Sequence, residues 1–345
     1  MKKAILLLIF SSVFILYISC DSDLTSPDLN IAIEISDHIL EGYFVTAISF
    51  ESNKTAWIGT FKQGLIQYDD GSATIYNSST SAFPDSIVIR DIEIDNHYNI
   101  WIGSNIGLIK FDRKNFHIYN TINSPIPENV VWSIAIDQDN VLWFASCRFR
   151  KGGLMKFDGT NWTLYTPENS AMPSNSVWDI AVDRDNNIWL IMNETVGGGC
   201  IIKISEDTWE IFDENDIGFA PYYFGDLTID YNNNIYASID YGLSSLHDMT
   251  RPNIIVYDGS RWRINNPTDK DGESLGYVGK ISCDLCMNLW ATLEGRENIS
   301  LAVFNGHKWI YNNPDFPINW ISEIAVDESN TVWAGTGDGI YLIKQ

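Results

Sequence analysis

One short pattern, an aromatic residue with an acid six positions before it, recurs along the whole chain. A well-formed copy is Trp101-Ile-Gly-Ser-Asn-Ile-Gly-Leu-Ile-Lys-Phe-Asp112, which alternates like two strands joined by a tight turn. The aromatic positions, 42 to 54 residues apart, are Trp57, Trp101, Trp143, Trp189, Tyr236, Trp290 and Trp333. The acids are Glu51, Asp95, Asp137, Asp183, Asp230, Asp284 and Asp327. Because one copy could not bury its own apolar faces, the pattern predicts repeats packed side by side.

Each repeat is predicted to contain four strands and no helix. In the third repeat, alternating residues 132–137 end at the acid, and a turn rich in Asp and Asn leads to the strand that carries the aromatic. Residues 153–158 and 162–165 supply two further strands, separated by a turn that contains Gly159. A period of about forty residues with four short strands indicates a β-propeller.

The number of repeats fixes the number of blades and the way the ring closes. The first three strands occur seven times, but the last copy reaches the end of the chain at Gln345 without a fourth strand. An extra strand-like run at residues 30–35 can pair with that copy. We expect an all-β, seven-bladed propeller over residues 31–345, closed by its N-terminal strand. A β-helix or an open solenoid is the alternative.

The N-terminus has the composition of a secretory signal. Lys2 and Lys3 precede an apolar run that ends at Ile18, and Cys20 follows a small residue. This arrangement resembles the lipobox of bacterial lipoproteins. The resemblance implies a signal peptide at residues 1–19, acylation of Cys20 (palmitate) and a flexible tether at residues 20–30. It also implies a membrane-anchored protein of the bacterial cell envelope. A plain signal peptide or an uncleaved anchor is the alternative.

Charge and cysteine content narrow the function classes. The formal net charge of −23 disfavours nucleic acid and anionic lipid head groups as partners. Cys283 and Cys286 form a single CxxC without a second pair, so core packing of Cys283 is favoured over metal or redox chemistry. Whether these two, Cys147 and Cys200 form disulfides stays open.

The repeats resemble those of the two-component regulator propeller family, found in the periplasmic sensor regions of bacterial hybrid regulators. The matching segments are Trp57-Ile-Gly-Thr60 with Gly64-Leu65, Trp101-Ile-Gly-Ser104 with Gly107-Leu108, and Trp333-Ala-Gly-Thr336 with Gly339-Ile340. The resemblance implies a propeller that presents a ligand-binding surface.

The first strand of each repeat is expected to line the central channel. Polar residues recur there four positions before the acid, and four of them are carboxylates: Asp91, Asp179, Asp226 and Glu323. Several carboxylates around one axis could hold a hard cation such as calcium, which makes them a weak metal-site hypothesis. The alternative is a water-filled channel in which Lys280 neutralises part of the charge.

A second group of residues is expected at the end of the ring that carries the loops before the first strand and between the second and third strands. We call this end the top face. The candidate ligand-binding residues are Arg90, Trp132, Trp178, Tyr223, Tyr277 and Trp320, with Arg148 and His247 from longer loops. Aromatic rings at a channel mouth suit sugars or flat ligands. Alternatively, the tryptophans pack against neighbouring blades.

The sequence contains no nucleophile elbow, zinc signature or nucleotide-binding loop. The leading hypothesis is a non-enzymatic, monomeric, membrane-anchored protein that binds a glycan, a peptide or a partner protein, in sensing or uptake. One alternative is a lyase similar to virginiamycin B lyase, with Glu294, His247 and the channel carboxylates as the available catalytic groups. Another is a scaffold that acts through protein contacts alone.

Overall fold

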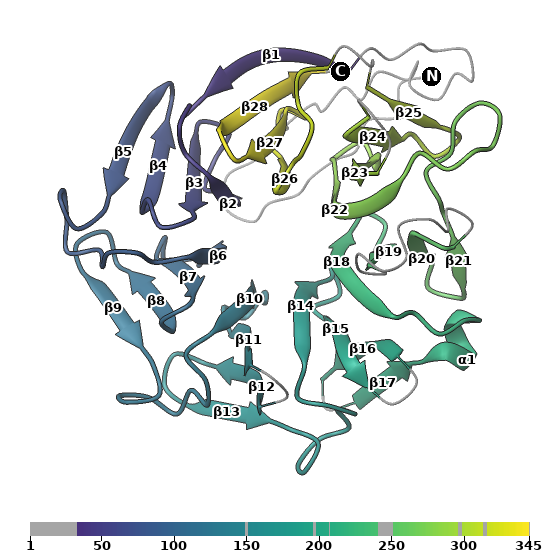
Figure 1. The fold of residues 1–345 in the computed structure, drawn as a ribbon. Helices are drawn as coiled ribbons and strands as arrows, with labels where there is room; N and C mark the ends of the chain where they lie inside the picture. Colours follow the sequence, from purple (N-terminus) through teal and green to yellow (C-terminus); the bar gives the residue numbers. More distant parts are fainter. Residues whose placement is uncertain are drawn as a thin grey trace, which may run out of the picture.

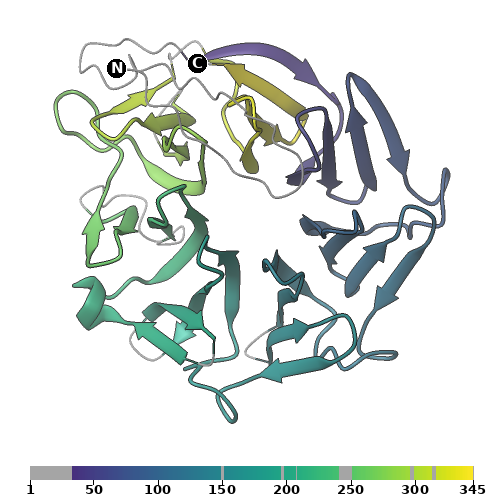
Figure 2. The same cartoon turned by 180° about the vertical axis from the view of Figure 1, so that it is seen from behind.

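The computed structural model describes residues 33–148, 151–195, 198–206, 208–240, 251–295, 299–312 and 316–344. Within these ranges the chain forms seven antiparallel sheets of four strands each, arranged as a ring (Figure 1; Figure 2 shows the reverse side). The predicted all-β, seven-bladed propeller is confirmed. In each blade we label the strands a to d, from the channel outward.

The first four blades use strands in chain order. Blade 1 contains β2 (Val45–Phe50), β3 (Thr55–Thr60), β4 (Leu65–Asp69) and β5 (Ser72–Tyr76). Blade 2 contains β6 (Ile89–Ile94), β7 (Ile100–Ser104), β8 (Leu108–Phe111) and β9 (Phe116–Tyr119). Blade 3 contains β10 (Val131–Ile136), β11 (Leu142–Arg148), β12 (Lys151–Phe157) and β13 (Trp162–Tyr165). Blade 4 contains β14 (Val177–Val182), β15 (Ile188–Thr195), β16 (Gly198–Ser205) and β17 (Thr208–Phe212).

The remaining blades follow the same order until the ring closes. Blade 5 contains β18 (Tyr223–Ile229), β19 (Ile235–Asp240), β20 (Ile254–Tyr257) and β21 (Trp262–Ile264). Blade 6 contains β22 (Tyr277–Cys283), β23 (Leu289–Glu294), β24 (Leu301–Phe304) and β25 (Trp309–Tyr311). Blade 7 contains β26 (Glu323–Val326), β27 (Val332–Thr336), β28 (Gly339–Lys344) and β1 (Glu34–Ile39). A short helix, α1 (Glu214–Ile217), precedes blade 5. In the described part of the chain, no helix has the length and apolar character needed to cross a membrane.

The N-terminal strand completes the last blade, as predicted. β1 pairs antiparallel with β28 from Glu34 opposite Lys344 to Ile39 opposite Ile340, and lies at the outer edge of blade 7 (Figure 1). The ring of His38 stacks on that of Tyr341 with 3.9 Å between centroids. The described strand begins at Glu34, so it lies further along the chain than the predicted run at residues 30–35.

The acid and the aromatic of every repeat are hydrogen-bonded to each other. In blade 2 the indole N–H of Trp101 donates to Asp95 Oδ2 at 3.0 Å. The other oxygen of Asp95 accepts the backbone N–H groups of His97 and Asn99, which closes the turn between strands a and b. The corresponding aromatic–acid distances in blades 1 and 3 to 7 are 2.9, 3.0, 2.8, 3.3, 3.2 and 3.0 Å. The spacing of six residues between the acid and the aromatic is constant because the same short turn separates them in every blade.

Close packing between blades depends on the glycine that follows Trp-Ile. A Cβ on Gly59 would lie 2.3 Å from Ile89 in the next blade, and one on Gly103 would lie 3.1 Å from Val131. The glycines therefore let strand a of the next blade approach strand b closely. Buried aliphatic and aromatic side chains fill the remaining space between sheets.

The thiols that the structure defines as free are Cys147, Cys200 and Cys283. Cys147 and Cys200 are buried, and burial raises the pKa of each to about 12. Cys283 packs against the core between blades 5 and 6, which agrees with the packing role expected from the sequence.

Candidate functional site

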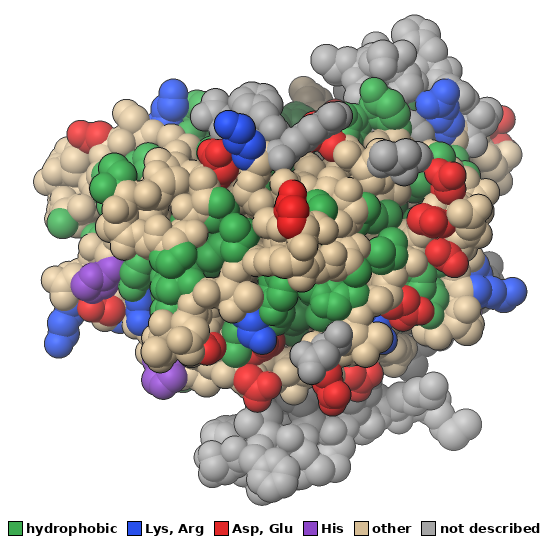
Figure 3. Space-filling model, turned by 90° about the horizontal axis from the view of Figure 1, so that it is seen from below, with side chains coloured by type: hydrophobic (Ala, Val, Ile, Leu, Met, Phe, Trp, Pro, Cys, Tyr) green, Lys and Arg blue, Asp and Glu red, His purple; other side chains and the backbone are tan. Residues whose placement is uncertain are grey.

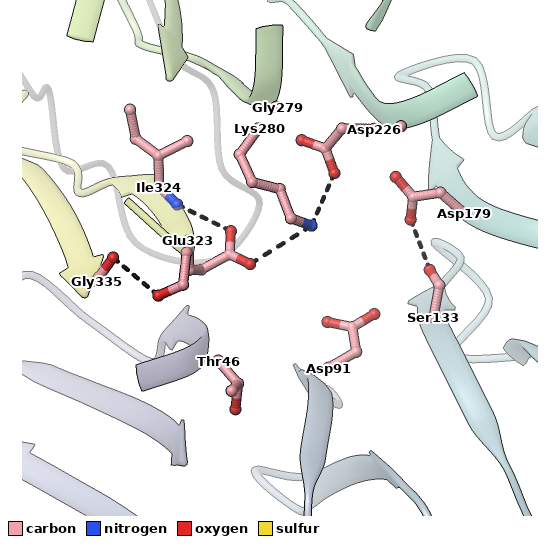
Figure 4. Close-up of polar contacts among 12 residues, drawn as sticks. Thr46, Asp91, Ser133, Asp179, Asp226, Gly279, Lys280, Glu323, Ile324 and Gly335 are labelled. Atoms are coloured by element: carbon pink, nitrogen blue, oxygen red, sulfur yellow. Dashed lines mark hydrogen bonds and ion pairs between the residues drawn. The ribbon is translucent and has the colours of Figure 1, made fainter. Parts of the chain in front are cut away.

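The side chains predicted to line the channel do so, and they come from the first strand of each blade. Figure 4 shows Asp91, Ser133, Asp179, Asp226, Lys280 and Glu323 directed toward the centre of the ring. The register of strand a against strand b shifts just before these positions in several blades, as between Ile89 and Asp91 or between Val131 and Ile134. Such a bulge leaves backbone N–H groups free to bond elsewhere.

Three of the channel carboxylates accept these N–H groups from the next blade. One oxygen of each carboxylate bonds the backbone N–H that follows the equivalent channel position one blade further on. The pairs are Asp91 with Ile134 at 2.7 Å, Asp179 with Leu227 at 2.9 Å, and Asp226 with Ile281 at 2.8 Å. These carboxylates therefore join neighbouring blades.

Other polar side chains make the equivalent connections. Ser133 Oγ accepts the N–H of Ile180 at 3.1 Å and donates to Asp179 at 2.8 Å. The Lys280 ammonium lies 3.0 Å from Asp226 and 3.6 Å from Glu323 (Figure 4). Two hydroxyls complete the circle: Thr46 donates to Ile89 O, and Ser322 donates to Val45 O, both at 2.7 Å. All seven blade junctions thus have a polar contact beside the channel.

Burial and neighbouring charges shift the pKa values of several side chains in the channel. Burial raises the pKa of Asp91 to about 7, and the charge of Asp179 adds to the effect. Burial likewise raises the pKa of Glu93, two residues further along the strand, to about 8, with a contribution from Asp91. Burial lowers the pKa of Lys280, but Asp226 and Glu323 outweigh that effect and raise it. The channel therefore holds a lysine whose pKa is raised, together with Asp91 and Glu93, in which burial disfavours the ionised form.

The hypothesis of a calcium site in this ring stays a prediction. Within the described ranges, no group of three or more His, Cys, Asp or Glu side chains is placed to hold a metal ion. Asp91, Asp179 and Asp226 bond backbone N–H groups, and Lys280 contacts Asp226 and Glu323. Every one of these four carboxylates therefore has a donor or a cation within the protein.

Arg90, Trp132 and Trp178 form a stack along the rim of the top face. The Arg90 guanidinium lies 3.8 Å from the centre of the Trp132 ring, and Trp132 stacks on Trp178 at 5.0 Å. The indole N–H groups donate to backbone oxygens, that of Trp132 to Cys147 and that of Trp178 to Gly225. Trp132 serves packing, because it lies between two neighbours, whereas Trp178 remains 40% exposed.

Trp320 belongs to a second aromatic group at the same end of the ring. It is 44% exposed, and its indole N–H donates to Glu294 at 3.1 Å. Phe44 meets its ring edge-on at 5.6 Å, and Phe61, 42% exposed, lies 5.4 Å from Phe44. Sequence reasoning missed Phe44 and Phe61. The sequence could have indicated them by position, because Phe44 lies one residue before strand a and Phe61 lies one residue after strand b.

The other candidates of the top face are only partly described. Tyr223 begins strand a of blade 5 and packs at 4.7 Å against Tyr222, which is 60% exposed. Tyr277 begins strand a of blade 6 and is half-buried. The Arg148 side chain, His247 and Cys20 lie outside what the structure describes.

The outer wall of the ring differs from the rim. Seen from the side, hydrophobic side chains are spread along the wall among acidic ones (Figure 3). Among the exposed side chains of β17 and β21 are two aliphatic ones, Ile211 and Ile264. Four of the exposed aromatic residues, Phe61, Trp178, Tyr222 and Trp320, lie at the top ends of the inner strands.

Two segments of the chain match a known repeat family. Residues 125–148 and 171–194 match the model of the two component regulator propeller, which confirms the resemblance noted in the sequence. Each matched segment covers the start of a blade through its second strand. No curated protein matches the sequence.

Solved structures share the fold at low sequence identity. The extracellular domain of a proposed hybrid two component system, BT4673 from B. thetaiotaomicron, is 18% identical with a TM-score of 0.65. The match covers 90% of this chain and 39% of that chain, so this chain spans about two fifths of the sensor domain. An inactive virginiamycin B lyase from Staphylococcus aureus, solved with quinupristin, is 14% identical with a TM-score of 0.69. That match covers 91% of this chain and 99% of the lyase.

A third similar structure is PorZ of Porphyromonas gingivalis, described as a bacterial surface component of the type-IX secretion system. It is 15% identical with a TM-score of 0.66, and the match covers 91% of this chain and 47% of PorZ. At these identities the likeness establishes the propeller fold alone. Function must therefore be argued from the residues of this chain.

Proposed function

We propose that this chain is a binding module whose ligand lies on the top face, at the mouth of the channel. The observation that carries the proposal is the placement of exposed aromatic rings there, at Trp178, Trp320, Phe61 and Tyr222. Large apolar side chains held by packed neighbours on one rim favour a contact surface. The channel groups below them are bonded between blades and support the rim.

The ligand class that this rim favours is a glycan. Trp178 has its N–H bonded within the protein, so its exposed part offers an apolar surface to the CH groups of a sugar ring. Lys62, 5.0 Å from the Phe61 ring centre, adds a cationic donor beside the second aromatic group. A peptide or a partner protein is the alternative ligand. The extracellular domains among the similar structures support a location in the cell envelope, and anchoring through Cys20 is part of the proposal.

A glycan array probed with this chain tests the proposal, followed by titration of the sugars that bind. Replacing Trp178 or Trp320 with Ala is expected to weaken binding about tenfold or more, as for aromatic anchors at other interfaces. Tyr98→Ala is the control, because Tyr98 is also an exposed aromatic residue (60%) but lies in the turn after strand a, at the other end of the blades. Equal losses in Tyr98→Ala and Trp178→Ala would contradict a site on the top face.

A lyase activity is the second candidate, favoured by the match over almost the full length of virginiamycin B lyase. Elimination requires a general base, and one described acid that contacts a top-face aromatic is Glu294, whose oxygen already accepts the Trp320 N–H. Elimination opens the ring without a change of mass, so incubation with quinupristin is followed by chromatography and tandem mass spectrometry, which separate and identify the linear product. A product formed by the parent chain but not by Glu294→Gln would support the lyase; an unchanged substrate would exclude this activity on quinupristin.

A further inference from the structure

A pocket of about 660 Å³ lies between blades 2 and 3, at the end of the ring opposite the top face. We call it the blade 2–3 pocket. Aromatic side chains of Trp101, Tyr119 and Phe157 form part of its lining, and Lys110, Asp139 and Asp158 are among its polar groups. Its volume lies in the range of small-molecule sites. None of the top-face residues discussed above contributes to it.

The neighbouring junction shows why this pocket is open. In blade 2, Arg113 follows Asp112 in the turn between strands c and d and reaches across to blade 1. Its guanidinium lies 5.1 Å from the centre of the Trp57 ring and pairs with Glu51 at 2.9 Å. Arg113 thus covers the aromatic–acid pair of blade 1.

Blade 3 carries a glycine at the equivalent position. Gly159 follows Asp158 in the turn between strands c and d, faces Trp101 and Asp95 of blade 2, and lines the pocket. A Cβ on Gly159 would meet no atom within 4 Å. The backbone conformation is similar at both positions, with φ of +73° at Arg113 and +90° at Gly159. The side chain that covers the junction of blades 1 and 2 is therefore missing here.

Two hydrogen-bond donors of the pocket have no partner in the described part of the protein. The Lys110 ammonium lies 5.1 Å from the Trp101 ring centre without a carboxylate partner, and the Tyr119 hydroxyl is likewise unbonded. On the acceptor side, Asp139 receives one bond, from Asn186, at one of its two oxygens. The pocket thus offers both donors and an acceptor next to aromatic rings.

We propose that the blade 2–3 pocket binds a neutral sugar residue. The partly exposed rings of Tyr119 and Phe157 would contact the CH groups of the sugar ring. Lys110 and Tyr119 would donate to its hydroxyl oxygens, and Asp139 would accept from a hydroxyl. The carboxylates around the pocket, Asp95, Asp139 and Asp158, oppose an acidic sugar. This site is independent of the proposed top-face site.

Saturation-transfer NMR on the full chain, with glucose, galactose, mannose and N-acetylglucosamine as probes, tests the proposal. At least one of these sugars is expected to bind. Gly159→Arg gives the junction of blades 2 and 3 the arginine that covers the junction of blades 1 and 2. This variant is expected to abolish the saturation-transfer signal of the bound sugar. Lys110→Met removes a donor but keeps most of the aliphatic chain, and it is expected to weaken binding about tenfold, as loss of one charged hydrogen bond does.

Matched variants distinguish this site from the top face and from general damage. Gly259→Arg makes the same change in the equivalent turn of blade 5, where φ is +86° and a Cβ also meets nothing within 4 Å. Gly259→Arg and Trp178→Ala are expected to bind the probes as the parent does, with unchanged circular dichroism in every variant. Binding by none of the four sugars, full binding by Gly159→Arg, loss in Trp178→Ala, or tighter binding of glucuronate than of glucose would overturn the proposal.

Discussion

The indole N–H of Trp101 donates to the carboxylate of Asp95 across a turn of five residues, at 3.0 Å. Trp101 is 95% buried, so its N–H has no access to bulk water and needs an acceptor within the protein. Asp95 serves this need while also closing the turn through two backbone N–H groups. Although burial raises the pKa of Asp95, hydrogen bonds from Asn99 and Trp101 outweigh that effect and lower it. One carboxylate therefore fixes both the turn and the core aromatic.

Replacing Asp95 with Ala is expected to lower the free energy of unfolding by roughly 3 kcal/mol, because buried donors lose a charged acceptor. The donors are the backbone N–H groups of His97 and Asn99 and the side chains of Asn99 and Trp101. Denaturant unfolding measures the effect. Asp271→Ala, at an exposed turn position, is the control and should change stability by less than about 0.5 kcal/mol. Equal effects of the two changes would show that the Asp95 bonds contribute nothing specific.

Replacing Lys280 with Met is expected to destabilise the fold by roughly 1–2 kcal/mol at neutral pH, a value reduced because solvent reaches part of the ammonium. The change leaves Asp226 and Glu323 facing each other without a cation. The loss should shrink as the pH falls, because both carboxylates then take up protons. Thermal unfolding at pH 5 and pH 7 measures it. Lys54→Met removes an ion pair that is exposed on both sides and serves as the control; a comparable loss there would contradict a special role for Lys280.

Glu93→Gln is expected to change the pH dependence of stability. The pKa of Glu93 is raised from an ordinary 4.5 to about 8 in the fold, so between these values the folded state holds a proton that the unfolded state has lost. The contribution of Glu93 to stability therefore falls as the pH rises through this window. The Gln variant should match the parent near pH 4.5 and become the more stable of the two toward pH 8. Unfolding midpoints across this range measure the difference, and parallel curves would refute the shift.

A chain that begins at residue 41 lacks β1 and is expected to aggregate and to melt at a lower temperature. Its β28 would present unpaired backbone groups at the edge of blade 7. A chain that begins at residue 33 keeps every described strand and is the control. Light scattering during thermal unfolding compares the two. A peptide with the sequence of residues 33–40, added in trans, should reduce aggregation of the shorter chain; a monomeric short chain with unchanged melting would refute this role of β1.

The sequence was sufficient to predict the seven blades and their closure, because both depend on local periodicity. The spacing from Asp95 to Trp101 reflects one short turn, and the alternation around it reflects one strand. It also placed Asp91 and its counterparts at the channel, because polar residues recur at this position of the first strand. These predictions do not depend on the contacts between neighbouring blades.

Contacts between blades were harder to predict. That Asp91 would bond the backbone of Ile134 depends on a bulge and on the angle between two sheets, and neither has a short sequence signature. The stacking of Arg90, Trp132 and Trp178 depends on the same angle. The difference between Arg113 and Gly159 was visible in the aligned repeats, but its meaning required the pocket that it leaves.

The pairing of β1 with β28 has a consequence for how the protein is made. The two strands are about 300 residues apart in the chain, so blade 7 cannot be completed until β28 has been synthesised. Contacts of such long range slow folding, and the incomplete ring exposes strand edges until β1 and β28 have paired. Nascent chains therefore pass through a period of greatest aggregation risk that ends when the last strand emerges. A chaperone that shields strand edges during this interval would raise the yield more than one that acts on the finished ring.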